Sequence, residues 1–541
     1  MILKNHTMIS FKRMSKLAVV ATAAFVMAGC SGNDELLASK GNMLPDNAMW
    51  AVKVNADQLW NKALGEPGAP ARDMWQAGKS MASMYTSEFG EFGDVLRQIL
   101  ADPAALGVNM KEPLVLTCAG EVSQMDEYEM DGNVEMCLVA LLDNSEAFLK
   151  VADAAVTFAK AEADVVVFKD VEQDGYTHYE FVADEGVSVD LGVTEESAVV
   201  RFKFDTVGNA EGLSGSMLAL FEGDGPQDED GLNAFYASAA DVAIWGDFDT
   251  MMNMALPVLE MQEADVAAQF EAYLPMYSGS SVVTDLDFQD GKTVLNVGVY
   301  GSEELEAYAG KYNKKASDKF FKQLPEPAFV AFNVAIKDFA GIVDEMCRIN
   351  PDYVDLLAYL EEEYDFNKEL LNGFPGLVTF ALTGAGLYSD VPAFGLMMEC
   401  DESVWEYAQE YLAEYAEADE NGVYNIGEMV YVGYTDGYIY AKDAETFNGL
   451  NSSSFADNAY AKIIAKGGAV IDLEALPTDI LDDFASEINY YMKGEELLQY
   501  VTSVVVDPSD DFMSATVTVN MGDKNHNLLE KLVLEAVNSM L

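Results

Sequence analysis

Histidine, the usual general base beside a catalytic nucleophile, is scarce in this sequence. The chain has three histidines, and His178 and His526 are the two that follow the N-terminal leader described below. His178 comes just after a predicted turn, and His526 precedes the last predicted helix. Neither belongs to a known catalytic motif, and residues 212–216 lack the final glycine of a nucleophile elbow. We therefore predict no catalytic residue and interpret both histidines as surface or strand residues.

Carboxylates are so numerous, with 92 acidic side chains, that no catalytic pair can be singled out. Residues 170–175 match the first half of an EF-hand loop, but Phe181 stands where the bidentate glutamate is needed, which favours a hairpin turn. Residues 222–231 are interpreted as a solvated acidic loop, with weak divalent-cation binding as the alternative. The Gly-x-Gly at 384–386 lacks a third glycine. We predict no metal site and no cofactor.

The cysteines allow two interpretations. Beyond Cys30 the chain has Cys118, Cys137, Cys347 and Cys400, with no pair at CxxC spacing, and two histidines are too few for a typical zinc site. Cys118 and Cys137 lie in consecutive predicted strands. They form either a cross-strand disulfide or a pair of buried free thiols.

The first thirty residues have the composition of a secretion signal that ends at a cysteine. Four basic residues and no acid occupy positions 1–16, and positions 17–28 form an uncharged apolar run. That run is too short to span a bilayer, which takes about 20 residues. Ala28-Gly29-Cys30 resembles the lipobox of bacterial lipoproteins, which implies cleavage before Cys30 and lipidation of that residue. We predict a signal peptide at 1–29, a tether at 30–43, and membrane attachment through lipid on Cys30.

The tether also carries information on location. Residues 31–35, Ser-Gly-Asn-Asp-Glu, resemble the export signal that sends lipoproteins of Bacteroidetes to the outer cell surface. We therefore predict an outer-membrane lipoprotein that faces the cell surface, with the periplasmic face as the alternative.

The charge of the chain excludes two classes of protein. It has 31 basic and 92 acidic residues, a net charge of −61. Removal of residues 1–29 takes away four basic residues and no acidic one, which leaves 27 basic and 92 acidic residues and a net charge of −65. Nucleic-acid binders and polybasic membrane-surface proteins are thereby excluded. The chain is nevertheless 50% hydrophobic, so we expect folded domains rather than disorder. Mutual repulsion favours a monomer.

The sequence contains an internal similarity. Residues 44–54 match 324–334 without gaps, and two further pairs follow in the same order: 114–155 with 377–412, and 281–312 with 503–537. Three collinear pairs indicate a duplicated domain. We predict a first repeat domain at 44–316 and a second at 317–541.

Hydrophobic patterns within each copy predict the fold class. Runs of period 2 joined by short turns, such as the Asp-Gly at 436–437, indicate antiparallel hairpins. Long helical patterns lie between the strand clusters, at 72–100, 145–163, 262–275, 302–322, 350–371, 403–417, 478–500 and 525–540. We predict an α+β fold, with mainly antiparallel sheet and several helices in each repeat.

Five lysines gather at the predicted junction of the two repeats. They are Lys311, Lys314, Lys315, Lys319 and Lys322. On a continuous helix four of them form one stripe. The favoured interpretation is a solvated face on a helix that docks by its aromatic side chains, and the alternative is a positive seam between two acidic domains.

The leader cysteine, the opening strand 44–55 and the order of segments resemble a family of uncharacterised Bacteroidetes lipoproteins. That family has a Leu-Pro-x-x-Ala opening strand after the lipobox cysteine, matched here by 44–48. The resemblance implies surface or periplasmic lipoprotein status and no reaction. We expect a non-enzymatic binding or structural module with a protein or glycan ligand.

Two other functions remain as alternatives. One is a secreted glycan-acting hydrolase that uses paired carboxylates, and the other is an envelope-assembly chaperone that pairs edge strands with client strands. All five tryptophans lie in apolar strand or helix patterns, which predicts core packing rather than sugar stacking: Trp50, Trp60, Trp75, Trp245 and Trp405.

Overall fold

The computed structural model describes residues 44, 48–124, 130–162, 166–171, 175–182, 187–205, 221, 229–262, 264–350, 352–374, 376–384, 392–449, 454–476 and 500–538. The chain divides into two compact units. Unit 1 comprises Met1–Phe288, Val299–Gly301 and Leu529–Leu541, and unit 2 comprises Gln289–Gly298 and Ser302–Leu528. This division does not test the predicted repeat boundaries, which stay a prediction.

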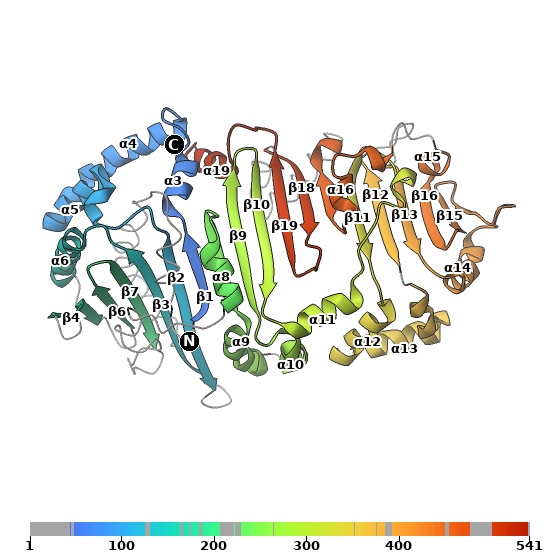
Figure 1. The fold of residues 1–541 in the computed structure, drawn as a ribbon, viewed down its shortest axis with the longest axis horizontal. Coiled ribbons are helices and arrows are strands. Elements are labelled where there is room, and N and C mark those ends of the chain that lie inside the picture. The colour runs from blue at the N-terminus through green and yellow to red at the C-terminus, as the bar shows by residue number, and fades with distance from the viewer. Residues whose placement is uncertain are drawn as a thin grey trace, which may run out of the picture. The chain divides into compact units, whose positions relative to one another are not determined.

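Unit 1 is built on an antiparallel sheet with the strand order β9-β8-β1-β2-β3-β7-β6-β5-β4 (Figure 1). Its strands are β1 (Ala48–Val54), β2 (Leu114–Gln124), β3 (Met130–Leu141), β4 (Val166–Val171), β5 (Thr177–Val182), β6 (Val187–Val193), β7 (Ser197–Asp205), β8 (Val242–Asp247) and β9 (Ser281–Gln289). Its helices are α3 (Ala56–Leu64), α4 (Pro70–Tyr85), α5 (Gly90–Ala101), α6 (Ser145–Glu162), α8 (Glu229–Ala237), α9 (Phe248–Gln262), α10 (Ala264–Tyr277) and α19 (Leu528–Asn538).

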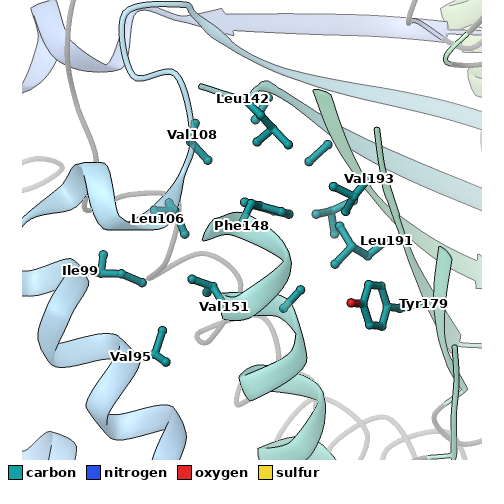
Figure 2. Packing of buried hydrophobic residues seen from close by; sticks show 14 of the residues in the cluster. Val95, Ile99, Leu106, Val108, Leu142, Phe148, Val151, Tyr179, Leu191 and Val193 are labelled. Carbon is teal, nitrogen blue, oxygen red and sulfur yellow. The ribbon is translucent and has the colours of Figure 1, made fainter. Parts of the chain in front are cut away.

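The two faces of this sheet bury two separate cores, because successive side chains of a strand point to opposite faces. On one face, α5 and α6 pack against β5 and β6 (Figure 2). In Figure 2, Ile99 of α5 and Phe148 of α6 point toward Leu191 of β6. Each such buried side chain contributes roughly 1.5–3 kcal/mol to folding.

On the other face, α8 presents Leu232, Phe235 and Tyr236 at helical spacing to the sheet. They pack with residues such as Val139 of β3 and Val199 of β7. The next residue of β3, Ala140, and the preceding residue of β7, Ala198, belong to the first core. Successive residues of each strand therefore point into different cores.

Unit 2 has an antiparallel sheet with the order β10-β19-β18-β17-β11-β12-β13-β16-β15-β14. Its strands are β10 (Lys292–Tyr300), β11 (Ala328–Ala335), β12 (Leu377–Thr383), β13 (Phe394–Glu399), β14 (Tyr424–Ile426), β15 (Val430–Thr435), β16 (Tyr438–Asp443), β17 (Ala469–Asp472), β18 (Val501–Pro508) and β19 (Ser514–Met521). Its helices are α11 (Glu303–Tyr312), α12 (Phe339–Ile349), α13 (Asp352–Tyr364), α14 (Glu402–Tyr415), α15 (Ala444–Phe447) and α16 (Ala461–Ile464).

Aromatic side chains dominate the core of unit 2. Phe321 meets Phe455 edge to face at 5.1 Å between ring centroids, and Phe320 lies 4.7 Å from Tyr438. Phe320, Phe321 and Phe455 are each no more than 1% exposed. Such contacts between aromatic rings stabilise the core beyond the burial of their apolar surface.

The predicted α+β class with antiparallel sheet is confirmed. The predicted helix at 145–163 is α6, the one at 403–417 is α14, and the hairpin around 436–437 is formed by β15 and β16. Asp436 and Gly437 have φ angles of 49° and 80° at its turn, the backbone that a tight hairpin requires.

Three predicted helices are wrong in extent. The pattern at 350–371 is one of them, because α13 ends at Tyr364 and a separate 3-10 turn follows at Lys368–Gly373. The pattern at 72–100 divides into α4 and α5, separated by a 3-10 turn at Thr86–Phe89; a side chain on Gly93 would collide with the Thr86 carbonyl. The helix predicted at 302–322 ends at Tyr312, and the segment that follows brings Phe320 and Phe321 into the core. The predicted helix at 478–500 lies outside the described residues. Within the described ranges, no helix combines the length and apolar character needed to cross a bilayer.

Buried polar side chains lie in the central strands of both units. Lys53 of β1 is 1% exposed, and its Nζ donates to the carbonyls of Tyr236 at 2.8 Å and Ser238 at 2.5 Å. Asn333 of β11 is fully buried; its amide donates to the Ser317 carbonyl at 2.9 Å and its Oδ1 accepts from the Thr379 hydroxyl at 2.7 Å. Such groups are tolerated in a sheet interior because they are hydrogen-bonded.

We expect Asn333→Ala to lower the free energy of unfolding by about 2–3 kcal/mol, because it leaves the buried Thr379 hydroxyl without this partner and removes the hydrogen bond to the Ser317 carbonyl. The matched control is Asn296→Ala, which removes an exposed bond from Thr516 and should cost about 0.5 kcal/mol or less. Urea unfolding followed by circular dichroism measures both. Equal losses in the two variants would contradict the role of burial.

Candidate functional site

A cluster of charged side chains lies on the α8 side of the unit 1 sheet. Cys137 of β3, Arg201 of β7 and Asp190 of β6 are directly opposite one another across the three strands, so their side chains share a face. Arg201 donates to Asp190 Oδ2 from Nε at 3.0 Å and from Nη2 at 2.6 Å. Lys203 Nζ lies 2.9 Å from the same oxygen. Two cations therefore share one carboxylate.

The cluster is buried, which strengthens its electrostatics. The side chain of Asp190 is 2% exposed and that of Arg201 is 7% exposed. Burial would raise the pKa of Asp190, but the neighbouring cations Arg201 and Lys203 outweigh it, and the pKa lies well below its ordinary value. His178 Nε2 is 3.7 Å from Asp190 Oδ1, too far for a direct hydrogen bond. Asp190 is thus held as a carboxylate.

The thiol beside this cluster is held in its protonated form. Cys137 is fully buried, and its Sγ donates to Glu135 Oε1 at 3.3 Å. Burial, followed by the negative charge of Glu135, raises the pKa of Cys137 well above its ordinary value. Because the thiolate is the reactive form, this cysteine is not arranged as a nucleophile. The cluster is an ion-pair network that neutralises buried charge.

A pair of carboxylates shares a lysine elsewhere in unit 1. Lys62 Nζ donates to Asp241 Oδ2 at 2.8 Å and to Asp287 Oδ1 at 2.6 Å, and the Phe288 amide donates to Asp241 Oδ2 at 2.7 Å. Burial raises the pKa of Asp241 despite the lysine. The Asp241 side chain has no exposed surface. A substrate therefore cannot reach that carboxylate in this conformation.

A cleft of about 90 Å³ opens between α3, α4 and α5, and two tryptophans line it. Trp60 and Trp75 meet edge to face at 4.7 Å between ring centroids. Buried Leu64, Ile99 and Leu100 contribute apolar walls. The cleft is small beside the roughly 300–1,000 Å³ of pockets that enclose whole ligands.

Polar side chains also line this tryptophan cleft. They are Arg72, Gln76 and Lys79 of α4. The Arg72 guanidinium is fixed by its bonds to the Gly65 carbonyl, from Nε at 3.0 Å and Nη2 at 2.6 Å. In a chain with so few basic residues, two cations therefore lie beside two indole rings in this cleft.

The sequence patterns predict core packing for all five tryptophans, and two of them line the cleft instead. Trp245 and Trp405 are buried at 1% and 7% exposure, as core packing predicts. Trp60 and Trp75 are half-buried and line the cleft instead. The available signal was the spacing of Arg72, Trp75 and Lys79, which places three cleft residues on one face of a helix.

The pairing register of β2 and β3 shows whether Cys118 and Cys137 form a disulfide or remain free thiols. Thr117 is the residue opposite Cys137, and Cys118 is opposite Met136. The two cysteines therefore point to opposite faces of the sheet, and both are free thiols. The disulfide interpretation is wrong.

The remaining candidate residues of the sequence analysis are the lipidation cysteine, the two acidic loops and His526. Cys30 lies outside the described residues, as does most of the acidic loop 222–231. β4 and β5 pair antiparallel around the EF-hand-like segment, as the hairpin interpretation predicts. His526 is half-buried, and its Nδ1 lies 2.6 Å from Asp523 Oδ2. In the described part of the chain, no three His, Cys, Asp or Glu side chains are grouped to hold a metal ion.

The junction lysines do not form a helical stripe, because α11 ends at Tyr312. Lys315 pairs with Asp510 at 2.8 Å, and Lys319 pairs with Glu399 at 2.7 Å. These carboxylates belong to unit 2, as the lysines do. The two pairs therefore give no support to a seam between domains.

Comparison with known proteins finds one weak structural similarity. No family model and no curated protein matches this chain. One solved structure is similar in part, a DUF4853 family protein from Actinomyces odontolyticus, with 17% identity and a TM-score of 0.13. The match covers 20% of this chain and 63% of that chain. A similarity this weak carries no conclusion about function.

Asp190→Asn should lower the free energy of unfolding at pH 7 by about 3–5 kcal/mol, because it removes the carboxylate shared by two buried cations. The folded-state pKa of Asp190 is depressed. Its stabilisation is therefore present above the unfolded value of about 3.9 and is lost as the pH falls through the acid range below it. Chemical unfolding at pH 7, 5 and 3 measures this.

The control is Asp94→Asn, which removes an exposed pair with Arg97 at 2.9 Å and should change stability by less than about 1 kcal/mol. A variant at Asp190 that unfolds like the wild type at pH 7 would contradict the structural role of the cluster.

Proposed function

We propose that this protein is a lipid-anchored, non-enzymatic binding module of the cell envelope, displayed on the outer surface of a Bacteroidetes-type cell. The signal peptide at 1–29, the lipobox cysteine Cys30 and the acidic tether support the anchor and the location. The Leu-Pro-x-x-Ala opening at 44–48 supports membership of the lipoprotein family that it resembles.

The proposal includes two homologous repeats. β1 lies between β2 and β8, and β11 lies between β12 and β17. Each central strand has a register shift near its start, at Ala48/Trp50 and at Ala328/Val330, which are 280 positions apart like the matched sequences. Lys53 and Asn333, the buried polar residues of the two strands, have the same offset. These correspondences support a duplication.

The tryptophan cleft is the observation that carries the binding function. Its indole rings suit the face or edge of a sugar ring, and Arg72 and Lys79 suit a carboxylate on it. We therefore propose that the cleft takes one sugar of an acidic glycan. The buried carboxylate pair of Asp241 and Asp287 gives a hydrolase less support, because Asp241 is inaccessible.

The anchor is tested by growing cells with an alkyne fatty acid and visualising the labelled protein. We expect the wild type to be labelled and Cys30→Ser to be unlabelled and released from the membrane, because the acyl chains on Cys30 are the proposed attachment. Protease treatment of intact cells tests surface display. Labelling of the Cys30→Ser variant would contradict the proposed anchor.

The cleft is tested by titrating the purified protein with tetragalacturonate and following tryptophan fluorescence. We expect Lys79→Glu to weaken binding by about tenfold or more, because a repulsive charge replaces a charge-assisted contact. Lys111→Glu, an exposed lysine of unit 1 outside the cleft, is the matched control and should leave binding nearly unchanged. Equal weakening by both variants, or equal binding of neutral tetragalactose, would contradict an acidic-sugar site.

A further inference from the structure

Helix α13 of unit 2 is unusual because none of its residues is buried. Several of its large side chains are exposed: Tyr359 is 53% exposed, Val354 50% and Leu356 49%. A concentration of large apolar side chains on one exposed helix is typical of an interaction surface.

The end of α13 is fixed to α14 by tyrosines. Tyr407 Oη donates to the Tyr364 carbonyl at 2.8 Å, and Tyr411 Oη donates to the same oxygen. The ring of Tyr364 lies 6.2 Å from that of Tyr359 and 6.4 Å from that of Tyr411. Tyr415 follows Tyr411 by four residues, on the same face of α14, and is 73% exposed. We name Tyr359, Tyr364, Tyr411 and Tyr415 the tyrosine surface.

The helices that carry the tyrosine surface are purely acidic. α13 has five carboxylates and α14 has four, and neither contains a lysine or an arginine. Glu361, Glu362 and Glu363 are exposed directly before Tyr364. Exposed tyrosine rings flanked by carboxylates attract cations in two ways, through the ring faces and through charge.

We propose that the tyrosine surface is a docking site for a basic polypeptide segment, rich in arginine or lysine, on a partner protein. Charge complementarity selects this occupant: a second copy of this chain or another acidic protein would be repelled. Guanidinium groups stack on tyrosine rings while pairing with neighbouring glutamates. This surface is in unit 2 and the tryptophan cleft is in unit 1, so the proposal goes beyond the binding of a glycan.

The test must separate the aromatic surface from the general acidity of the chain. We would titrate the full mature chain, carrying Cys30→Ser for solubility, with a fluorescent deca-arginine peptide and follow anisotropy. The variant Tyr359→Ser/Tyr415→Ser keeps the net charge, and we expect it to bind about tenfold more weakly through loss of two ring faces. Tyr359→Phe/Tyr415→Phe keeps the rings and should bind like the parent.

The glutamates are tested with a matched pair of triple variants. Glu361→Gln/Glu362→Gln/Glu363→Gln removes three charges beside the tyrosine surface, and Glu303→Gln/Glu304→Gln/Glu306→Gln removes three exposed charges from the first turn of α11. We expect the first to weaken deca-arginine binding at least about fivefold more than the second, because proximity to the rings decides the contact. Circular dichroism confirms that each variant is folded.

Two results would overturn the proposal. Equal weakening by the two glutamine variants would show that the peptide senses net charge alone. Unchanged binding of the serine variant would show that the tyrosines make no contact. Either result leaves the lipid anchor and the tryptophan cleft untouched, since those are tested with fatty-acid labelling and tetragalacturonate.

Discussion

A polar group in the middle of a sheet that is covered on both faces must find a partner inside the protein, and the architecture of unit 1 depends on this constraint. Lys53 is in the central strand β1, and its ammonium reaches the carbonyls of Tyr236 and Ser238 at the end of α8. That contact lies at the C-terminal end of α8. The same helix covers the apolar row of Val139 and Val199.

The same requirement organises the charged residues. Arg201 and Lys203 project from β7 beneath the face that α8 covers, and both converge on Asp190. In unit 2, Asn333 of β11 is a buried neutral residue whose two polar atoms are satisfied by Ser317 and Thr379. The buried polar side chains of unit 1 are thus satisfied by backbone carbonyls and ion pairs, and Asn333 of unit 2 by two neutral hydrogen bonds.

Much of the secondary structure could be predicted from the sequence, because α6, α14 and the β15–β16 hairpin follow local periodicity and turn chemistry. The helix at 302–322 could not, because its end is decided by the burial of Phe320 and Phe321 in a core formed by distant segments. The candidate site was missed for a similar reason. Trp60 and Trp75 have the spacing of core residues, and α3, α4 and α5 leave a cleft between them only once they are packed. The tyrosines of α13 likewise follow an ordinary helical pattern, and their exposure depends on which neighbours the fold supplies.

The path of the chain through the two units has a consequence for any attempt to isolate them. Unit 1 takes Met1–Phe288, then Val299–Gly301, and finally Leu529–Leu541, which includes most of α19. In the folded protein Glu530 of that helix lies against Gly65 at the end of α3. A fragment that stops at residue 316 would therefore lack one of the helices of unit 1, and one that starts at 317 would carry that helix without its partners. No single cut in the backbone yields both units complete, so excision of either calls for a linker that rejoins separated segments.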